Sequence, residues 1–286
     1  MKKIVASLGV FLMYFSVNSA EPYWSDPEVN EVNRMKTHTS YFPYSSAETI
    51  INGPEASPDY LSINGKWRFN RVADFDQRPT DYYRKDYDDS GWTYIDVPGV
   101  WELNGFGDPV YVNIGYAWRG LFENNPPYVP VKGNHVGTYR REIEIPADWK
   151  GKDIIAHFGS AVSNIEVYVN GRFAGYGEDS KTAQEFDITR LVRPGERNLI
   201  ALQIHRWCDG TYLEDQDYFR HSGLARDNFL LARNRNRIED IRVNGDLTPD
   251  YRDGRLDVAV DIKGSGTLDL KPVSYTHLRA HETDSY

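Results

Sequence analysis

The chain has 286 residues, which is enough for one large domain or two smaller ones. Its formal net charge of −9 excludes nucleic acid as the main partner, because phosphate binding needs a basic surface. The single cysteine, Cys208, excludes an intramolecular disulfide.

The first residues have the three parts of a signal peptide. Lys2 and Lys3 form the charged start, residues 4–17 are an apolar run, and Asn-Ser-Ala at 18–20 offers a cleavage site. The apolar run is shorter than the ~20 residues that a membrane-spanning helix needs, and no other segment is apolar enough to span a bilayer. We therefore expect a signal peptide over residues 1–20, export to the periplasm or the medium, and no membrane partner.

An N-terminal arm follows over residues 21–60. It is polar and aromatic and lacks a clear period, although residues 28–34 are compatible with a short helix. Pro43 disfavours a helix at Phe42, so residues 41–44 should be extended. We expect the arm to lie over the surface of a domain.

From residue 61 onward the pattern is that of short strands. Residues 138–145 alternate, which places Tyr139, Ile143 and Ile145 on one face together with Arg141. Residues 199–204 are nearly all apolar, which predicts a buried strand.

One turn signal in this region is strong. Residues 165–169 and 172–176 flank Asn170-Gly171, and a type I′ hairpin turn needs positive φ at both central residues. Since helical periodicity is hard to find after residue 60, we expect an all-β jelly-roll sandwich over residues 61–235.

A second unit is predicted over residues 236–272. Residues 238–243 and 255–262 read as strands, the latter with Leu256, Val258, Val260 and Ile262 facing inward. Two strands cannot bury a core by themselves, so this unit is the beginning of a domain.

The tail over residues 273–286 breaks from this pattern. It has no strand alternation and resembles a translated sequencing adapter, so we expect it to be non-native. His277 and His281 are therefore not read as metal ligands.

Several motifs occur together in one order. They are SINGKWRF at 62–69, GDPVYVNIGY at 107–116, NPPYVP at 125–130, VGTYRR at 136–141, VNGRFAGYGEDS at 169–180, EFDIT at 185–189 and RWCDGTYLEDQDYFRHSG at 206–223. With these motifs the chain resembles the large β-galactosidases of glycoside hydrolase family 2 over roughly residues 30–262.

The resemblance implies an architecture and an activity. It implies that residues 61–235 are a jelly-roll sugar-binding domain and that residues 236–272 begin an immunoglobulin-like β-sandwich. The family's (β/α)₈ barrel carries both catalytic glutamates, so no residue of this chain is expected to be catalytic and the fragment is expected to be inactive. The implied reaction is retaining hydrolysis of terminal β-D-galactose, which uses two carboxylates ~5–5.5 Å apart.

The resemblance also implies two site residues. Asn113 in the 107–116 motif matches an asparagine that contacts galactose. Asp217 matches an aspartate that binds the galactosyl group and ligates sodium, whose other ligands would come from the barrel. The family further implies a magnesium site outside this chain, a β-galactoside substrate and a homo-oligomer.

Other residues of the acidic loop 206–223 are expected to support it. Glu214 and Asp215 should pair with Arg206, Arg220 or Arg226, since buried carboxylates need partners. The side chain of Trp207 is expected in the core rather than as a sugar-stacking platform, and His205 and His221 are expected to be structural.

Two alternatives remain open. The chain could be a free-standing carbohydrate-binding module, which would make it a binding protein and not part of an enzyme. It could also belong to another family 2 glycosidase, such as a β-glucuronidase or a β-mannosidase.

Overall fold

The computed structural model describes residues 22–44 and 47–267. The strands are, in chain order, β1 (Glu31–Val32), β2 (Tyr60–Ser62), β3 (Gly65–Val72), β4 (Thr93–Val97), β5 (Gly99–Val100), β6 (Val110–Val112), β7 (Val136–Glu144), β8 (Asp153–Phe158), β9 (Ala161–Val162), β10 (Asn164–Val169), β11 (Arg172–Glu178), β12 (Gln184–Asp187), β13 (Arg197–His205), β14 (Tyr218–Arg220), β15 (Gly223–Leu224), β16 (Asn228–Arg233), β17 (Arg237–Leu247) and β18 (Gly254–Lys263). Short 3₁₀ helices lie between them: η1 (Tyr23–Ser25), η2 (Ala47–Asn52), η3 (Pro54–Ala56), η4 (Phe75–Gln77), η5 (Glu102–Asn104), η6 (Ala147–Trp149) and η7 (Asp209–Tyr212). The predicted all-β class is confirmed.

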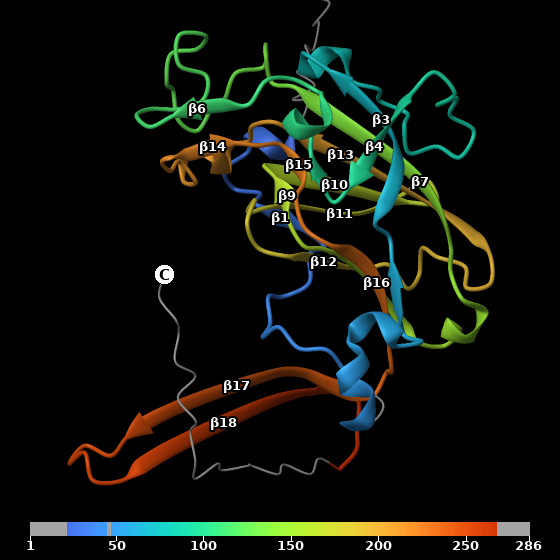
Figure 1. Ribbon diagram of the computed structural model, residues 1–286, viewed down its shortest axis with the longest axis vertical. Helices are drawn as coiled ribbons and strands as arrows, with labels where there is room; N and C mark the ends of the chain where they lie inside the picture. The colour runs from blue at the N-terminus through green and yellow to red at the C-terminus, as the bar shows by residue number, and fades with distance from the viewer. Residues whose placement is uncertain (1–21, 45–46, 268–286) are drawn as a thin grey trace, which may run out of the picture.

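Two antiparallel sheets form a sandwich (Figure 1). The larger sheet has the order β1-β11-β10-β13-β7-β3-β4, and the smaller has the order β12-β8-β16-β2. Their core includes the fully buried rings of Trp67, Phe69, Phe158 and Phe186. Burial of such large apolar side chains is the main force that holds the two sheets together.

The strongest sequence signals match the observed strands. Strand β13 lies inside the larger sheet between β10 and β7, where a nearly continuous apolar run is stable because both faces are covered. Asn170 and Gly171 have φ values of 52° and 83°, so the predicted β10–β11 hairpin turn is confirmed. In β7 the predicted inward residues Tyr139 and Ile143 are buried.

The predicted helix at residues 28–34 is wrong. Instead Glu31 and Val32 form β1, which pairs antiparallel with Gly177 and Tyr176 of β11. Asn33 then takes a positive φ of 56°, which is incompatible with a continuing helix. Pairing with the edge of the larger sheet overrides the weak local helical pattern. The arm thus lies against the sandwich, as expected.

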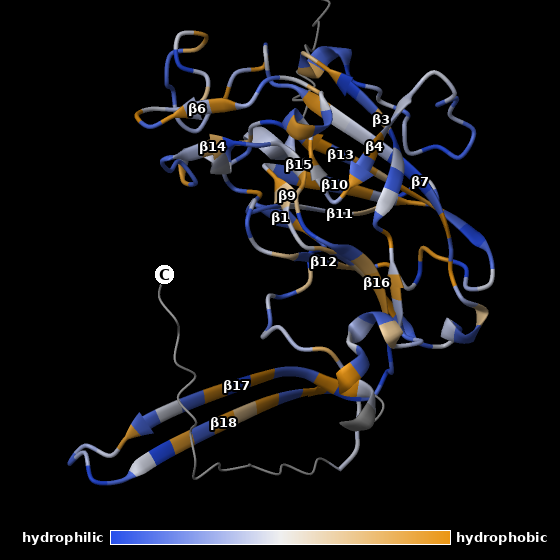
Figure 2. Cartoon of the chain, viewed as in Figure 1, coloured by the Kyte–Doolittle hydropathy of each residue, from blue (hydrophilic) through white to orange (hydrophobic). Residues whose placement is uncertain are grey.

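The β17–β18 hairpin lies apart from the body of the sandwich (Figure 1). Its strands alternate between apolar and polar residues (Figure 2). The expectation that one face is turned inward is not met within the described residues, because Leu256 is 58% exposed and Ile262 48%. The apolar face of this two-stranded sheet has no covering layer in the described part of the chain.

Two predictions lie outside the described residues. These are the signal peptide at 1–20 and the non-native tail at 273–286. Among the residues that the structure describes, no helix has both the length and the apolar character to cross a bilayer.

Candidate functional site

Strands β6 and β14 form a two-stranded ribbon at one end of the sandwich (Figure 1). Tyr218 pairs with Val112 and Phe219 with Tyr111. If this register is continued by one residue, Asp217 comes opposite Asn113. The two residues expected to bind sugar are therefore brought to the same end of one ribbon, although they lie far apart in the sequence.

Asp217 is held by a neighbour that the sequence did not point to. The Tyr111 hydroxyl donates to Asp217 Oδ1 at 2.6 Å, and this bond raises the pKa of Tyr111. The bond leaves Oδ2 of the exposed carboxylate without a hydrogen bond to any described residue. Tyr111 and Phe219 are about half exposed, and their ring centroids lie 5.2 Å apart. The ribbon thus presents a carboxylate beside two aromatic rings.

Asn113 is exposed at the end of β6. Its side chain forms no hydrogen bond within the described part of the chain. A side-chain amide can both donate and accept, which matches a sugar hydroxyl.

The acidic loop is braced by one ion pair and several hydrogen bonds. Asp215 pairs with Arg220, whose guanidinium also donates to Val112 O at 3.4 Å and lies 4.5 Å from the Tyr218 ring centroid. The predicted role of Asp215 is thereby confirmed. Arg220 ties the loop to the far strand of the ribbon, so it supports the placement of both Asn113 and Asp217.

The prediction that Glu214 pairs with an arginine is wrong. Glu214 Oε1 accepts from the backbone N–H of Ser180 at 2.8 Å. Arg206 and Arg226 are not its partners, since Arg206 contacts His135 and Arg226 donates to Lys181 O. A backbone N–H can satisfy a carboxylate oxygen through a charge-assisted hydrogen bond, and the sequence carries no signal for such a contact.

Behind the loop lies a second apolar cluster. It contains the buried residues Trp24, Trp118, Val129, Trp207 and Cys208. Trp207 is only 4% exposed, so it belongs to the core as predicted and offers no stacking surface. His205 is also buried, and desolvation lowers its pKa to about 3, so it stays neutral and structural.

Two acids next to this cluster, Glu178 and Asp209, were not predicted from the sequence as a pair. The ligand atoms of Glu178, Cys208 and Asp209 lie within 4.8 Å of one another. Desolvation raises the pKa of Glu178 to about 8, and Tyr176 donates to its Oε1 at 2.6 Å. A protonated Glu178 can donate to Asp209, so a shared proton accounts for this pair of acids.

The fit of the ribbon to a sodium ion is partial. Asp217 supplies hard carboxylate oxygen, which suits such a cation. Among the described residues, however, it belongs to no group of three potential ligand side chains. A cavity of about 40 Å³ beneath the loop has room for little more than water. Among the described residues, Asp217 could therefore supply only part of a cation site, and further ligands would have to come from elsewhere.

Comparison with known proteins defines the family. A family model described as "Glycosyl hydrolases family 2, sugar binding domain" matches residues 60–234. The chain belongs to glycoside hydrolase family 2. The matched residues include the smaller sheet, the larger sheet except β1, and the β6–β14 ribbon.

Relatives of this family 2 chain carry the name "Beta-galactosidase". One from Priestia megaterium is 37% identical over 251 residues, which cover 87% of this chain and 24% of the relative. Another from Lactobacillus delbrueckii subsp. bulgaricus is 37% identical over 247 residues, covering 86% of this chain and 24% of the relative. The family 2 chain thus spans about a quarter of the length of these relatives.

Solved structures support the fold of the family 2 chain. A β-glucuronidase from Ruminococcus gnavus matches with a TM-score of 0.52 and 19% identity, covering 72% of this chain and 33% of that one. A β-glycosidase from Bacteroides vulgatus matches with a TM-score of 0.52 and 20% identity, covering 72% of this chain and 24% of that one. At these identities the likeness concerns the fold alone.

Proposed function

We propose that the chain is the sugar-binding part of a β-galactosidase and that its β6–β14 ribbon contributes to the galactose site. The observation that carries this proposal is the placement of Asn113 and Asp217 at one exposed end of the ribbon, with Tyr111 orienting the carboxylate. The names of the relatives at 37% identity support the choice of β-galactosidase.

The proposed contribution of the ribbon is binding. The Asn113 amide would hydrogen-bond a galactose hydroxyl, and Asp217 would bind the galactosyl group and give one oxygen to sodium. The Tyr111 hydroxyl bonds to Oδ1, which leaves Oδ2 available for a second partner. Retaining hydrolysis needs a pair of carboxylates on opposite sides of the scissile bond. We place that pair in a part of the enzyme outside this chain, so the fragment alone should not cleave galactosides.

The remaining sequence expectations stay predictions. They are export, a homo-oligomeric full-length enzyme, and a magnesium site formed by residues outside this chain.

A substrate panel tests the proposed activity. The full-length enzyme that carries this chain should hydrolyse an aryl β-galactoside and leave the corresponding aryl β-glucuronide and β-mannoside nearly untouched. Preference for the glucuronide or the mannoside would overturn the β-galactosidase proposal. An open reading frame that ends without a catalytic domain would instead favour a carbohydrate-binding module.

A further inference from the structure

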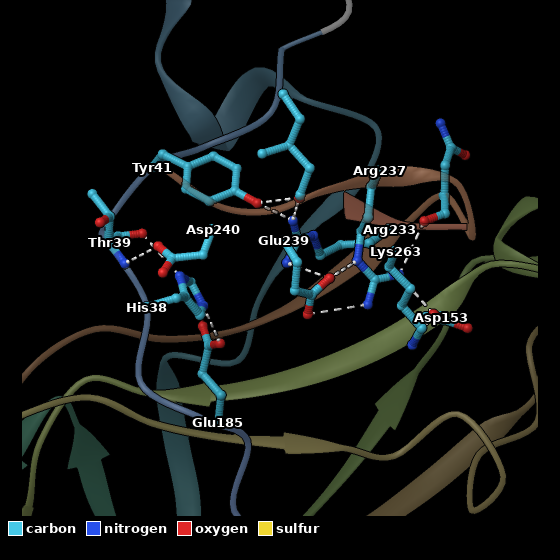
Figure 3. Close-up of polar contacts among 12 residues, drawn as sticks. His38, Thr39, Tyr41, Asp153, Glu185, Arg233, Arg237, Glu239, Asp240 and Lys263 are labelled. Carbon is cyan, nitrogen blue, oxygen red and sulfur yellow. Dashed lines mark hydrogen bonds and ion pairs between the residues drawn. The ribbon is translucent and has the colours of Figure 1, made fainter. Parts of the chain in front are cut away.

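A short piece of the N-terminal arm lies between the sandwich and the β17–β18 hairpin (Figure 3). On the sandwich side, His38 Nε2 lies 2.8 Å from Glu185 Oε2 on β12. The other carboxylate oxygen, Oε1, lies 2.8 Å from His157 Nδ1 on β8. Glu185 and both imidazoles are at most 20% exposed, so solvent screens these contacts only partly.

On the hairpin side, the next residues of the arm bind strand β17. The Thr39 backbone N–H donates to Asp240 Oδ1 at 3.0 Å, and the Thr39 hydroxyl donates to Ile241 O at 2.8 Å. The Tyr41 hydroxyl donates to Ile238 O and accepts from Arg233 of β16. Residues 38–41 therefore contact β12, β16 and β17 at once.

A second attachment lies beside this one. Asp153 of β8 binds both strands of the hairpin, with Arg237 Nη1 at 2.6 Å and Lys263 Nζ at 3.0 Å (Figure 3). The two attachments hold different parts of the hairpin's base, since the arm binds residues 238–241 of β17 while Asp153 binds residues at the start of β17 and the end of β18.

The covalent link between the two units is short. Residues 234–236 join β16 to β17 and are all exposed. A link of this kind leaves torsional freedom, so contacts away from the link are needed to fix the direction of the hairpin. The arm also covers two carbonyl groups of β17, a strand whose only pairing among the described residues is with β18.

We propose that residues 38–41 are an interdomain clasp, which sets the orientation of the unit that begins with β17–β18 relative to the sugar-binding domain. His38 anchors the clasp on the sandwich, Thr39 anchors it on the hairpin, and Tyr41 touches both. The clasp does not depend on the proposed galactosidase activity, because none of its residues belongs to the β6–β14 ribbon.

A spin-label distance measurement on the 286-residue chain tests the clasp. Labels are placed on cysteines at the exposed positions Asn244 of β17 and Asp148 of η6, while the buried Cys208 stays unlabelled. The chain with the native clasp should give one narrow distance distribution. The double variant His38→Ala/Thr39→Val should broaden or shift this distance distribution. In hydrogen exchange, its amides at residues 238–241 should exchange about tenfold faster, while those of β13 stay protected.

The control is Thr248→Val near the far end of the hairpin. This residue also uses its hydroxyl in a hydrogen bond, to Asp250 at 2.6 Å, but it does not touch the arm. The control should leave the distance distribution unchanged. If the β13 amides of the double variant lose their protection from hydrogen exchange, the sandwich itself has been disturbed. The single variant Thr39→Val is then measured instead, because it removes one hydroxyl and keeps the backbone N–H. A native distribution with unchanged exchange at residues 238–241 would overturn the proposal.

Discussion

The Tyr111 hydroxyl donates a hydrogen bond to Asp217 across the β6–β14 ribbon, with 2.6 Å between the two oxygens. The residues are 106 positions apart, and only strand pairing brings them together. Because Asp217 is exposed, its carboxylate would otherwise sample several rotamers. Tyr111 restricts that motion and holds the carboxylate at the end of the ribbon that also carries Asn113.

Tyr111→Phe in the full-length enzyme should therefore raise KM for an aryl β-galactoside. The change removes one hydrogen bond to a charged, exposed group, for which we expect an effect of about fivefold. Tyr94→Phe is the matched control, since Tyr94 is a half-exposed tyrosine on β4, in the sandwich. Equal KM values for the native enzyme and both variants would show that Tyr111 does not position Asp217.

Gly137→Ala should destabilise the sandwich by about 3 kcal/mol or more. A Cβ at Gly137 would overlap the buried Trp101 ring and lie 3.0 Å from Phe69. Trp101 also donates its backbone N–H to Ser222 O at 2.9 Å, so its displacement would disturb the end of the acidic loop.

Gly245→Ala in β17 is the control for this substitution. A Cβ there meets nothing within 4 Å, so the free energy of unfolding of this variant should stay near the native value. Urea denaturation measures both variants. Equal stability of Gly137→Ala and the native chain would contradict the packing described for Trp101.

Glu178→Gln should stabilise the chain increasingly as the pH rises from 4.5 to 8. Desolvation raises the pKa of Glu178 from 4.5 to about 8, so the native state holds a proton that the unfolded state has released over this range. Native stability therefore falls with rising pH, while a glutamine has no proton to lose. The difference at pH 8 should be on the order of 2–4 kcal/mol. Thermal unfolding at pH 5 and pH 8 measures it, and a difference that does not change with pH would contradict a buried neutral acid.

The His38–Glu185 pair should also make native stability fall with rising pH, but over a more alkaline range. The hydrogen bond to Glu185 raises the pKa of His38 from 6.5 to about 9, so its stabilisation is complete below pH 6.5 and is lost as the pH rises through 9. Burial alone would raise the pKa of Glu185, but hydrogen bonds from His157 and His38 lower it from 4.5 to about 2. Its stabilisation is complete above pH 4.5 and is lost as the pH falls through 2.

Comparison of the native chain with His38→Gln measures the contribution of His38, while His157 still contacts Glu185. The native chain should be more stable by about 1–2 kcal/mol between pH 4.5 and 6.5, a value reduced from the full shift because solvent screens a partly exposed imidazole. The advantage should shrink between pH 6.5 and 9. A stability advantage of the native chain that grows between pH 6.5 and 9 would contradict a protonated His38 paired with Glu185.

The sequence predicted contacts whose cause is local. The alternation of apolar and polar residues and the Asn170-Gly171 turn were enough to predict the β10–β11 hairpin. Both signals are local, because side-chain direction and positive φ are set within a few residues. The ion pair of Asp215 with Arg220 was also predictable, since the two lie five residues apart with opposite charge.

Contacts between distant segments were not predictable from local chemistry. Residues 28–34 have a weak helical pattern, but the free edge of β11 takes Glu31 and Val32 as a strand. Glu214 accepts a hydrogen bond from the backbone N–H of Ser180, a contact that the identity of the residue does not predict. Asn113 and Asp217 were predicted from family resemblance alone, and their placement at one end of the ribbon depends on the pairing of β6 with β14, which local sequence does not indicate.

The most direct test of the galactose site is a sodium titration of the full-length enzyme with Asp217→Asn and Asp217→Ala. Because one carboxylate is proposed to bind both galactosyl group and cation, galactoside turnover and sodium dependence should be lost together, with KM rising at least about tenfold. Gln216→Ala, the exposed neighbour in the same loop, should retain both properties. Native kinetics and native sodium dependence in the two Asp217 variants would contradict the proposed role of the ribbon.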